Sequence, residues 1–349
     1  MKKTALVIAL SLAIGILSAC GSGNATPSQT TASNTGTDNS KKYTITMTHA
    51  TADTTSLHKG ALVFKEYLES KSGGRITVNI YPNAQLGADR ETIEGVQTGQ
   101  ITMMASSNAV QVNFVPDAVI FDLPFIYPNL ETARKVLADK NFIEKISASY
   151  AASGFHYLGT SDQGFRTLTA NKPVYSPSDL AGVTLRTMEN KYHMEAWKLM
   201  GSNPTPLAFN ELYTALQQGT VDAQENPIEL IFSQKFYEQQ KYIIGTNHIL
   251  QTIVWIMNED FYQELPEDLR ALVDSASEEA TKVANEYLDS SVDKLVKQMK
   301  DSGITFIDLT EEQLKAFSEK AMPVRDTVKA NCSEATYNAF MEAVNLATK

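Results

Sequence analysis

A strand, a helix and a second strand follow one another within 40 residues, and this order strongly restricts what the chain can fold into. Residues 43–49 alternate apolar and polar side chains, as in a half-buried strand. Residues 57–71 have apolar side chains at helical spacing and end at the pair Gly73-Gly74, a common helix terminus. Residues 75–81 alternate again. A strand–helix–strand unit of this length predicts parallel strands and therefore an α/β fold.

The same alternation continues along the chain. Helical patterns cover residues 89–98, 130–149 and 211–218. Strand patterns cover residues 101–105, 155–160, 180–186 and 249–257, and no internal repeat is present. We expect two sheets joined by strands that cross between them.

One segment, residues 267–300, contains neither proline nor glycine and has apolar side chains at helical spacing throughout. A single helix of this length would span roughly 50 Å, the width of a two-lobed protein. The alternative is two shorter helices with a break that the sequence does not mark. A region of about 305 residues exceeds the usual size of one hydrophobic core, so two lobes are expected.

The N-terminal residues are typical of an export signal. Lys2 and Lys3 precede an apolar run over residues 5–17, and small residues then lead to Cys20. The run is shorter than the roughly 20 residues that a transmembrane helix needs. We predict a signal peptide at 1–19, a lipidated Cys20, and a disordered linker at 20–42 that is rich in Gly, Ser and Thr. The alternative is a signal peptide with an incidental cysteine.

Composition narrows the class of partner. Removal of the leader reduces the 30 basic residues to 28 against 40 acidic ones, which leaves a net charge of about −12. Such a surface repels nucleic acid. Besides Cys20 the chain has only Cys332, so an intrachain disulfide is not expected once Cys20 is lipidated.

The sequence contains no recognisable catalytic motif. A nucleophile elbow, a phosphate-binding loop and a Cys-x-x-Cys pair are all missing, and the five histidines lack metal-ligand spacing. We expect neither enzymatic activity nor a cofactor nor a bound metal.

Two arginines at predicted strand ends are the most informative polar residues. Arg166 follows a polar segment that begins at Thr160, and Arg186 ends the pattern over residues 180–186. A guanidinium presents a planar pair of donors that matches a carboxylate, which suits a site for an organic acid. Taken singly, an arginine at a strand end more often forms a surface ion pair.

The segment 203–227 combines rigid and polar features. Its prolines restrict the backbone before a short helix, and the residues from Asp222 to Pro227 are predicted to form a polar turn that displays Asn226. Phe209 is either a plain core residue or part of a site, and Asn226 is either a turn residue or a ligand-binding one.

Several motifs, in order, resemble the solute-binding proteins of tripartite ATP-independent periplasmic (TRAP) transporters, the DctP family. They are Gln85-Leu-Gly-Ala-Asp-Arg90, Asp122-Leu-Pro-Phe125, Asp179-Leu-Ala-Gly-Val-Thr-Leu-Arg186, Pro204-Thr-Pro, Ala215-Leu-Gln-Gln-Gly219, Val221-Asp-Ala-Gln-Glu-Asn-Pro227 and Lys241-Tyr-Ile-Ile-Gly-Thr-Asn-His248. The resemblance extends from Tyr43 to the C-terminus.

The resemblance implies a two-lobed, periplasmic-binding-protein-like α/β fold with crossing strands, one long helix behind both lobes and a cleft that closes over the ligand. The expected first lobe comprises residues 43–163 plus about 252–290, and the second comprises 164–251 plus about 291–349. In the family, an arginine matching Arg186 binds the ligand carboxylate. A residue matching Asn226 assists it, one matching Phe209 packs beside the ligand, and one matching Arg166 contacts the carboxylate in many members.

Similarity to particular members of the family indicates which acid the protein binds. Residues 236–242 and 246–250 resemble sialic-acid binders, but the segment 104–109 lacks the charged residues expected of them. The motif 186–190 resembles members that take sugar acids. Ligand hydroxyls are then expected to bond to Glu189, Ser106, Asn108 and His49. Hexuronates such as D-glucuronate or D-galacturonate are the leading ligands, and sialic acid or a C4-dicarboxylate is the alternative. The alternative is that Glu189 and His49 only hold loops together.

These inferences predict an exported, monomeric binding protein that is anchored by lipid to the outer face of the membrane and delivers its ligand to TRAP permease subunits. Two rival functions remain. One is a sensor that presents the ligand to a receptor kinase, and the other is a surface enzyme acting on sugar acids.

Overall fold

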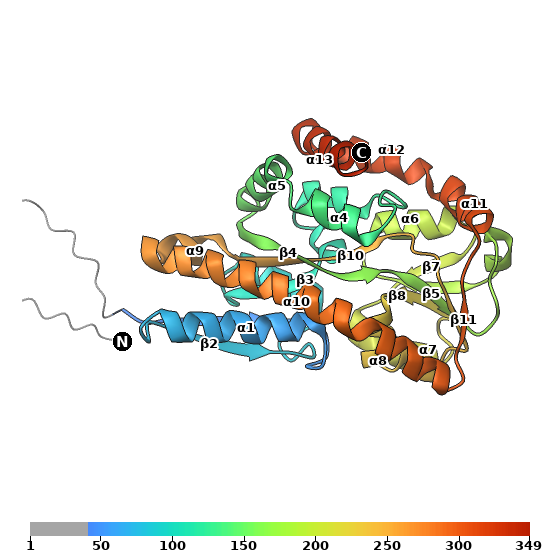
Figure 1. Cartoon of the computed structure of the whole chain (residues 1–349), viewed down its shortest axis with the longest axis horizontal. Coiled ribbons are helices and arrows are strands. Elements are labelled where there is room, and N and C mark those ends of the chain that lie inside the picture. Colours follow the sequence, from blue (N-terminus) through green and yellow to red (C-terminus); the bar gives the residue numbers. More distant parts are fainter. Residues whose placement is uncertain (1–40) are drawn as a thin grey trace, which may run out of the picture. The chain divides into compact units, whose positions relative to one another are not determined.

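The structure is a computed structural model in which residues 41–349 are described, and it contains two β-sheets flanked by helices (Figure 1). The predicted leader, Cys20 and the linker up to residue 40 lie outside the described residues. Within residues 41–349, none of the helices combines the length and the apolar character needed to cross a bilayer.

The first sheet contains the strand–helix–strand unit predicted at the start of the chain. Its strand order is β2 (Ile76–Tyr81), β1 (Tyr43–Thr48), β3 (Met103–Ser107), β10 (Leu250–Asn258) and β4 (Phe155–Phe165). Strand β1 runs parallel to β2 and β3, whereas β10 is antiparallel to β3 and β4. Ile45 and Met47 of β1 are fully buried, while Thr44 before them is exposed and Thr46 between them is partly exposed, which is the alternation that the sequence predicts.

The second sheet is built from shorter strands. Their order is β11 (Thr305–Ile307), β9 (Tyr242–Ile244), β5 (Thr167–Ala170), β8 (Ala223–Asn226), β6 (Thr184–Thr187) and β7 (Asn203–Pro206). Both sheets mix parallel and antiparallel pairs, so the parallel strands predicted from the first unit describe only part of each sheet.

The chain passes between the sheets three times: twice at neighbouring places, and once more from β10 to β11. Only Arg166 separates β4 in the first sheet from β5 in the second. A short connection joins β9 in the second sheet to β10 in the first, and the Arg166 N–H donates to Ile249 O in this connection (2.9 Å). The predicted two-lobed α/β fold with crossing strands is confirmed, and Arg166 lies at the crossing.

Helices surround both sheets (Figure 1). They are α1 (Ser56–Lys71), α2 (Asp89–Gln97), α3 (Asn108–Gln111), α4 (Leu130–Leu137), α5 (Lys140–Ala152), α6 (Lys191–Leu199), α7 (Leu212–Gln217), α8 (Ile228–Ser233), α9 (Glu259–Glu264), α10 (Glu267–Asp301), α11 (Glu311–Ala321), α12 (Pro323–Asn331) and α13 (Glu334–Ala347). Short 3-10 helices are η1 (Pro116–Asp122), η2 (Pro177–Leu180), η3 (Phe209–Glu211) and η4 (Phe236–Glu238).

Helix α10 is continuous over 35 residues, so the predicted single helix is confirmed and the alternative of two helices is wrong. Its first half, with Leu269 and Val273, packs into the core of the first sheet, and Met299 near its end packs with residues beside the second sheet. Helix α1 approaches α10 closely at Gly60, where an added Cβ would lie 2.7 Å from Ala280 O. Only glycine fits this contact without a shift of the backbone.

The exact lobe boundaries remain a prediction. Helices α11 and α12 contact α6, which belongs to the expected second lobe, but α13 packs against α4 and α5, which belong to the expected first lobe. The C-terminal residues therefore contact elements on both sides of the proposed boundary.

Two local predictions are wrong for identifiable reasons. Residues 130–149 form two helices, because the Asp139 side chain caps α5 by accepting a hydrogen bond from Phe142 N (2.9 Å). The strand predicted over 180–186 is shorter, because Leu180 ends η2 and Gly182 has a φ of 77°.

A third local prediction fails at the centre of the second sheet. The polar turn predicted from Asp222 to Pro227 contains the buried strand β8, which pairs with β5 on one side and β6 on the other. Its polar side chains bond within the sheet: Gln224 Nε2 donates to Thr169 Oγ1 (2.9 Å), for example. A strand can therefore be both polar and buried when its side chains bond to one another.

Candidate functional site

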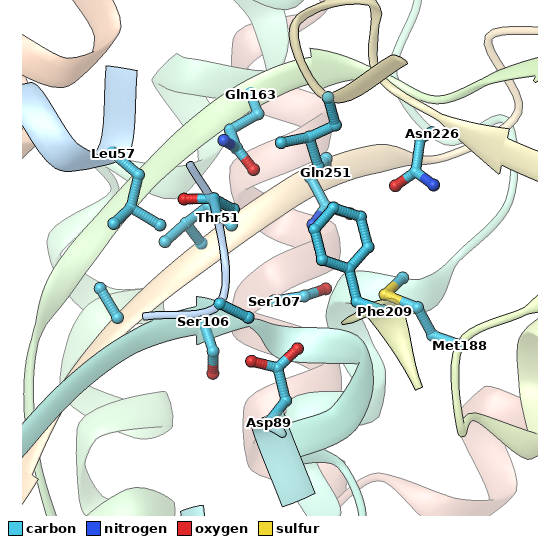
Figure 2. Close-up of a pocket in the computed structure, with 14 residues that line it drawn as sticks. Thr51, Leu57, Asp89, Ser106, Ser107, Gln163, Met188, Phe209, Asn226 and Gln251 are labelled. Carbon is cyan, nitrogen blue, oxygen red and sulfur yellow. The ribbon is translucent and has the colours of Figure 1, made fainter. Parts of the chain in front are cut away.

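Two neighbouring cavities lie between the sheets, with volumes of about 30 and about 20 Å³. They share Asp89, Met188 and Phe209, so they are two parts of one region, here called the cleft, and Figure 2 shows the larger part. The larger cavity is also lined by Ala50, Thr51, Leu57, Ala105, Ser106, Ser107, Gln163, Asn226, Leu230, Gln251 and Ile253, and the smaller by Ala88, Arg90, Val110, Arg186, Glu189, Leu207 and Ala208. Both sheets contribute residues, which is the arrangement expected of a ligand cleft between lobes.

Arg186 supplies a buried cation to the smaller cavity. It lies on β6, paired in register with Thr205 of β7 and Gln224 of β8, and is 1% exposed. Its Nε and Nη2 both donate to Leu207 O, at 2.9 and 2.6 Å. Its Nη1 is buried and has no hydrogen-bond partner among the described residues. One edge of the guanidinium is thus fixed by the backbone, and the other offers donors to the cleft.

Arg186 has both positively and negatively charged neighbours. Burial and the nearby Arg166 cation lower the pKa of Arg186 to about 10, so it remains charged at pH 7. Burial and the neighbouring Glu189 and Glu91 raise the pKa of Asp89 to about 6, against the opposing effect of Arg186. The lining of the cleft therefore contains the buried cation Arg186, the exposed cation Arg90, and two acidic side chains, Asp89 and Glu189.

Arg166 is paired within the protein. It is fully buried, and its Nη2 donates to Glu225 Oε1 at 2.8 Å. Its Nε donates to the same carboxylate, Nη1 to Gln251 Oε1, and Nη2 also to Glu225 O. Burial alone would raise the pKa of Glu225, but the Arg166 charge and the hydrogen bond from His248 hold that pKa far below its usual range.

The predicted contact of Arg166 with the ligand is therefore not seen in the geometry. Arg166 is not among the residues that line either cavity, because Glu225 and Gln251 take up its donors. It instead fixes two groups that do line the cleft: Gln251, and the end of β8 that carries Asn226.

Asn226 and Phe209 both lie at the cleft, where the sequence predicts them. Asn226 ends β8, is 1% exposed, and donates one of its N–H bonds to Gln224 Oε1 (2.5 Å). Its other N–H and its oxygen are left for the cavity. Phe209 lies in η3 and contacts Phe236 edge-on, with 5.8 Å between the ring centroids.

Two of the four residues expected to bind ligand hydroxyls also line the cleft. Ser106 lines the larger cavity and accepts a hydrogen bond from Gln111 Nε2 (2.9 Å). Glu189 lines the smaller cavity. The structure brings both residues close to Asp89.

His49 and Asn108 are buried but bond elsewhere. His49 contacts His58 through Nε2 (3.0 Å) and Thr51 through Nδ1 (3.1 Å), and burial together with His58 lowers its pKa to about 3. Asn108 donates to Asp122 Oδ1 (2.9 Å). Neither residue is among those that line the two cavities.

The cleft also contains polar residues that were not predicted from the sequence as site residues. Asp89 is the first residue of α2 and belongs to the motif that begins at Gln85. Gln163 and Gln251 lie on β4 and β10. The sequence feature that could have identified Gln163 is its polar side chain, three residues before Arg166 on the strand β4.

A buried arginine with free donors lies between two sheets that are joined by crossing segments of the chain. This arrangement is typical of binding proteins that enclose a small anion. The chain belongs to bacterial extracellular solute-binding protein family 7, or DctP, whose model matches residues 47–331.

Relatives and solved structures agree with this membership. The C4-dicarboxylate-binding periplasmic protein DctP of Rhodobacter capsulatus is 35% identical over 86% of this chain and 90% of its own. A sugar acid binding protein of Advenella mimigardefordensis, solved in complex with galactonate, is 27% identical with a TM-score of 0.84, covering 88% of this chain and 99% of its own. A TRAP solute-binding protein of Anaerococcus prevotii, solved with D-glucuronate, is 28% identical with a TM-score of 0.83, covering 87% and 99%.

Proposed function

We propose that this TRAP solute-binding protein captures a sugar-acid monocarboxylate, with hexuronates such as D-glucuronate or D-galacturonate as the leading ligands. The observation that carries the proposal is the buried Nη1 of Arg186, which has no hydrogen-bond partner within residues 41–349 although the cleft around it is rich in acceptors. One guanidinium edge matches one carboxylate. Asp89 and Glu189 can accept hydrogen bonds from hydroxyl groups of the same ligand.

The charges favour a monocarboxylate over a C4-dicarboxylate. A second carboxylate in the larger cavity needs a cation there, but none of the described residues that line that cavity is a cation: Arg186 and Arg90 line the smaller one, and Arg166 is neutralised by Glu225. It would also lie near Asp89 or Glu189, and like charges in a dehydrated cleft repel strongly. The galactonate and glucuronate complexes of two related proteins support this choice, whereas the name of the Rhodobacter relative supports the dicarboxylate alternative.

The ligand class can be tested by melting temperatures across a library of hexuronates, aldonates, sialic acid and C4-dicarboxylates. A ligand at 100 times its dissociation constant stabilises the native state by about 2.7 kcal/mol, which should raise the melting temperature by roughly 5 °C or more. We expect hexuronates to give the largest shift. A shift by sialic acid or succinate alone would contradict the ligand class and leave the family assignment intact.

The biological role follows from the family and from the predicted leader. We infer that the protein works on the outer face of the membrane, is anchored through Cys20, and releases its ligand unchanged to the TRAP permease. Radioactive palmitate should label the native protein in cells and not a Cys20→Ala variant. Equal labelling of both would refute the anchor. A permease gene beside this one would support transport, and a receptor-kinase gene in its place would support the sensor.

A further inference from the structure

A buried carboxylate, Glu229, lies behind the wall of the larger cavity and bonds to two elements at once. It is on α8 and is 3% exposed. Its Oε1 accepts a hydrogen bond from Ser56 N (2.6 Å) and its Oε2 accepts one from Ser56 Oγ (2.7 Å), at the first residue of α1. Oε2 also accepts a bond from Gln163 Nε2 (3.0 Å). Burial raises the pKa of Glu229, while these donors act in the opposite direction and favour its ionised form.

The contact with Glu229 determines which way the Gln163 amide faces. The oxygen and the nitrogen of a side-chain amide can exchange positions by a half-turn of the group without a change of shape. An ionised carboxylate can only accept hydrogen bonds, so the nitrogen of Gln163 must face Glu229. The amide oxygen then faces the larger cavity, and Figure 2 shows it turned toward the interior of the pocket. Gln163 is 2% exposed, and its Oε1 has no hydrogen-bond partner among the described residues.

An unpaired buried acceptor at a cavity wall favours a ligand that brings a donor to it. Gln163 belongs to the larger cavity and Arg186 to the smaller, so the two residues meet different ends of a ligand that extends through the cleft. We propose that Gln163, oriented by Glu229, accepts a hydrogen bond from a hydroxyl group at the end of the ligand remote from its carboxylate. The pair thereby selects hydroxylated acids against acids with a second carboxylate at that end. This inference rests on the proposed function.

A second carboxylate is rejected there for two reasons. When ionised it has no proton to donate to the Gln163 oxygen. It would also lie one side chain away from the Glu229 charge. The Asp89 carboxylate, in the same cavity, acts in the same direction.

The test compares D-glucuronate with D-glucarate by isothermal titration calorimetry. In glucarate a second carboxylate takes the place of the ring hemiacetal at C1 and its hydroxyl, and the chain is open. D-gluconate, which is also open but ends in a hydroxymethyl group, is the control for the loss of the ring. We expect native protein to bind glucuronate at least 100-fold more tightly. Gln163→Met, which keeps the size and removes the acceptor, should weaken glucuronate binding about 10- to 100-fold.

Glu229→Gln gives a readout that a purely structural role would not produce. Its new amide can donate to the Gln163 oxygen, which lets the Gln163 nitrogen face the cavity, so the preference for glucuronate over glucarate should fall at least tenfold. Glu278→Gln, at an exposed site on α10, is the matched control and should leave both affinities unchanged. Thermal unfolding shows whether each variant is folded. If Glu229→Gln is unfolded, the effect of Gln163→Met on glucuronate binding still tests the proposal.

The outcomes separate the two claims. Glucuronate binding that Gln163→Met changes by less than about threefold overturns the inference and leaves the proposed function standing. Native protein that binds neither acid overturns the proposed function, and the inference with it.

Discussion

Arg186→Ala is expected to weaken binding of a hexuronate by about 100-fold or more, because the ligand carboxylate would be left unpaired in a dehydrated cleft at a cost of several kcal/mol. Arg186→Lys should recover only part of this loss. A lysine keeps the charge, but its ammonium cannot both bond to Leu207 O through two parallel N–H groups and offer a third to the ligand. Calorimetric titration with D-glucuronate measures both effects.

The control for this prediction is Arg270→Ala, which removes the same side chain from α10, outside the cleft. Arg270 donates to Gln263 at the protein surface (2.9 Å), so its loss should not alter affinity. Near-native binding by Arg186→Ala, with an unchanged unfolding temperature, would exclude Arg186 as the carboxylate site.

Glu225→Gln is expected to destabilise the protein by about 3–5 kcal/mol, because it leaves the Arg166 cation buried without its counter-charge. The melting temperature should fall by roughly 5–10 °C. Replacing both partners, as Arg166→Met with Glu225→Leu, should recover much of the stability, since it removes the buried charges together. Glu131→Gln breaks an exposed pair with Lys135 and should change little.

The same ion pair predicts a dependence of stability on pH. The pKa of Glu225 is lowered on folding, so its contribution is fully present above the unfolded-state pKa of about 4.3 and is lost as the pH falls toward the folded-state value. The difference in unfolding free energy between the native protein and Glu225→Gln should therefore be largest at neutral pH and shrink below about pH 4. Urea unfolding at pH 7 and pH 3.5 measures it, and an equal difference at both would contradict the assignment.

Much of the architecture could be predicted because it depends on local patterns. Helix α10 has no residue that breaks a helix and repeats its apolar side chains along its whole length, so its continuity is visible in the sequence. The strand–helix–strand unit from Tyr43 to Tyr81 is equally local. Strand β8 could not be predicted this way, since its polar side chains are accommodated by partners such as Thr169, which lies 55 residues away.

The site residues likewise divide into features that the local sequence predicts and features that depend on distant contacts. Arg166 and Arg186 look alike in the sequence, and each ends or follows a strand. Which of them has a free donor depends on Glu225, which is 59 residues from Arg166 in the chain and adjacent to it in the sheet. The cleft role of Gln163 likewise depends on Glu229, 66 residues away. Motifs can identify the candidate residues, but pairing between distant segments decides which of them face a ligand.

The small volume of the cleft has a consequence for the time that a ligand stays bound. Cavities of about 30 and about 20 Å³ have room for a few water molecules, and a six-carbon acid is many times larger than one water. The cavities therefore cannot hold such a ligand as they stand, and we expect its entry and exit to require the two sheets to move apart. The dissociation rate is then governed by how often the protein opens, so ligands of different affinity can share a common upper limit to their release rate.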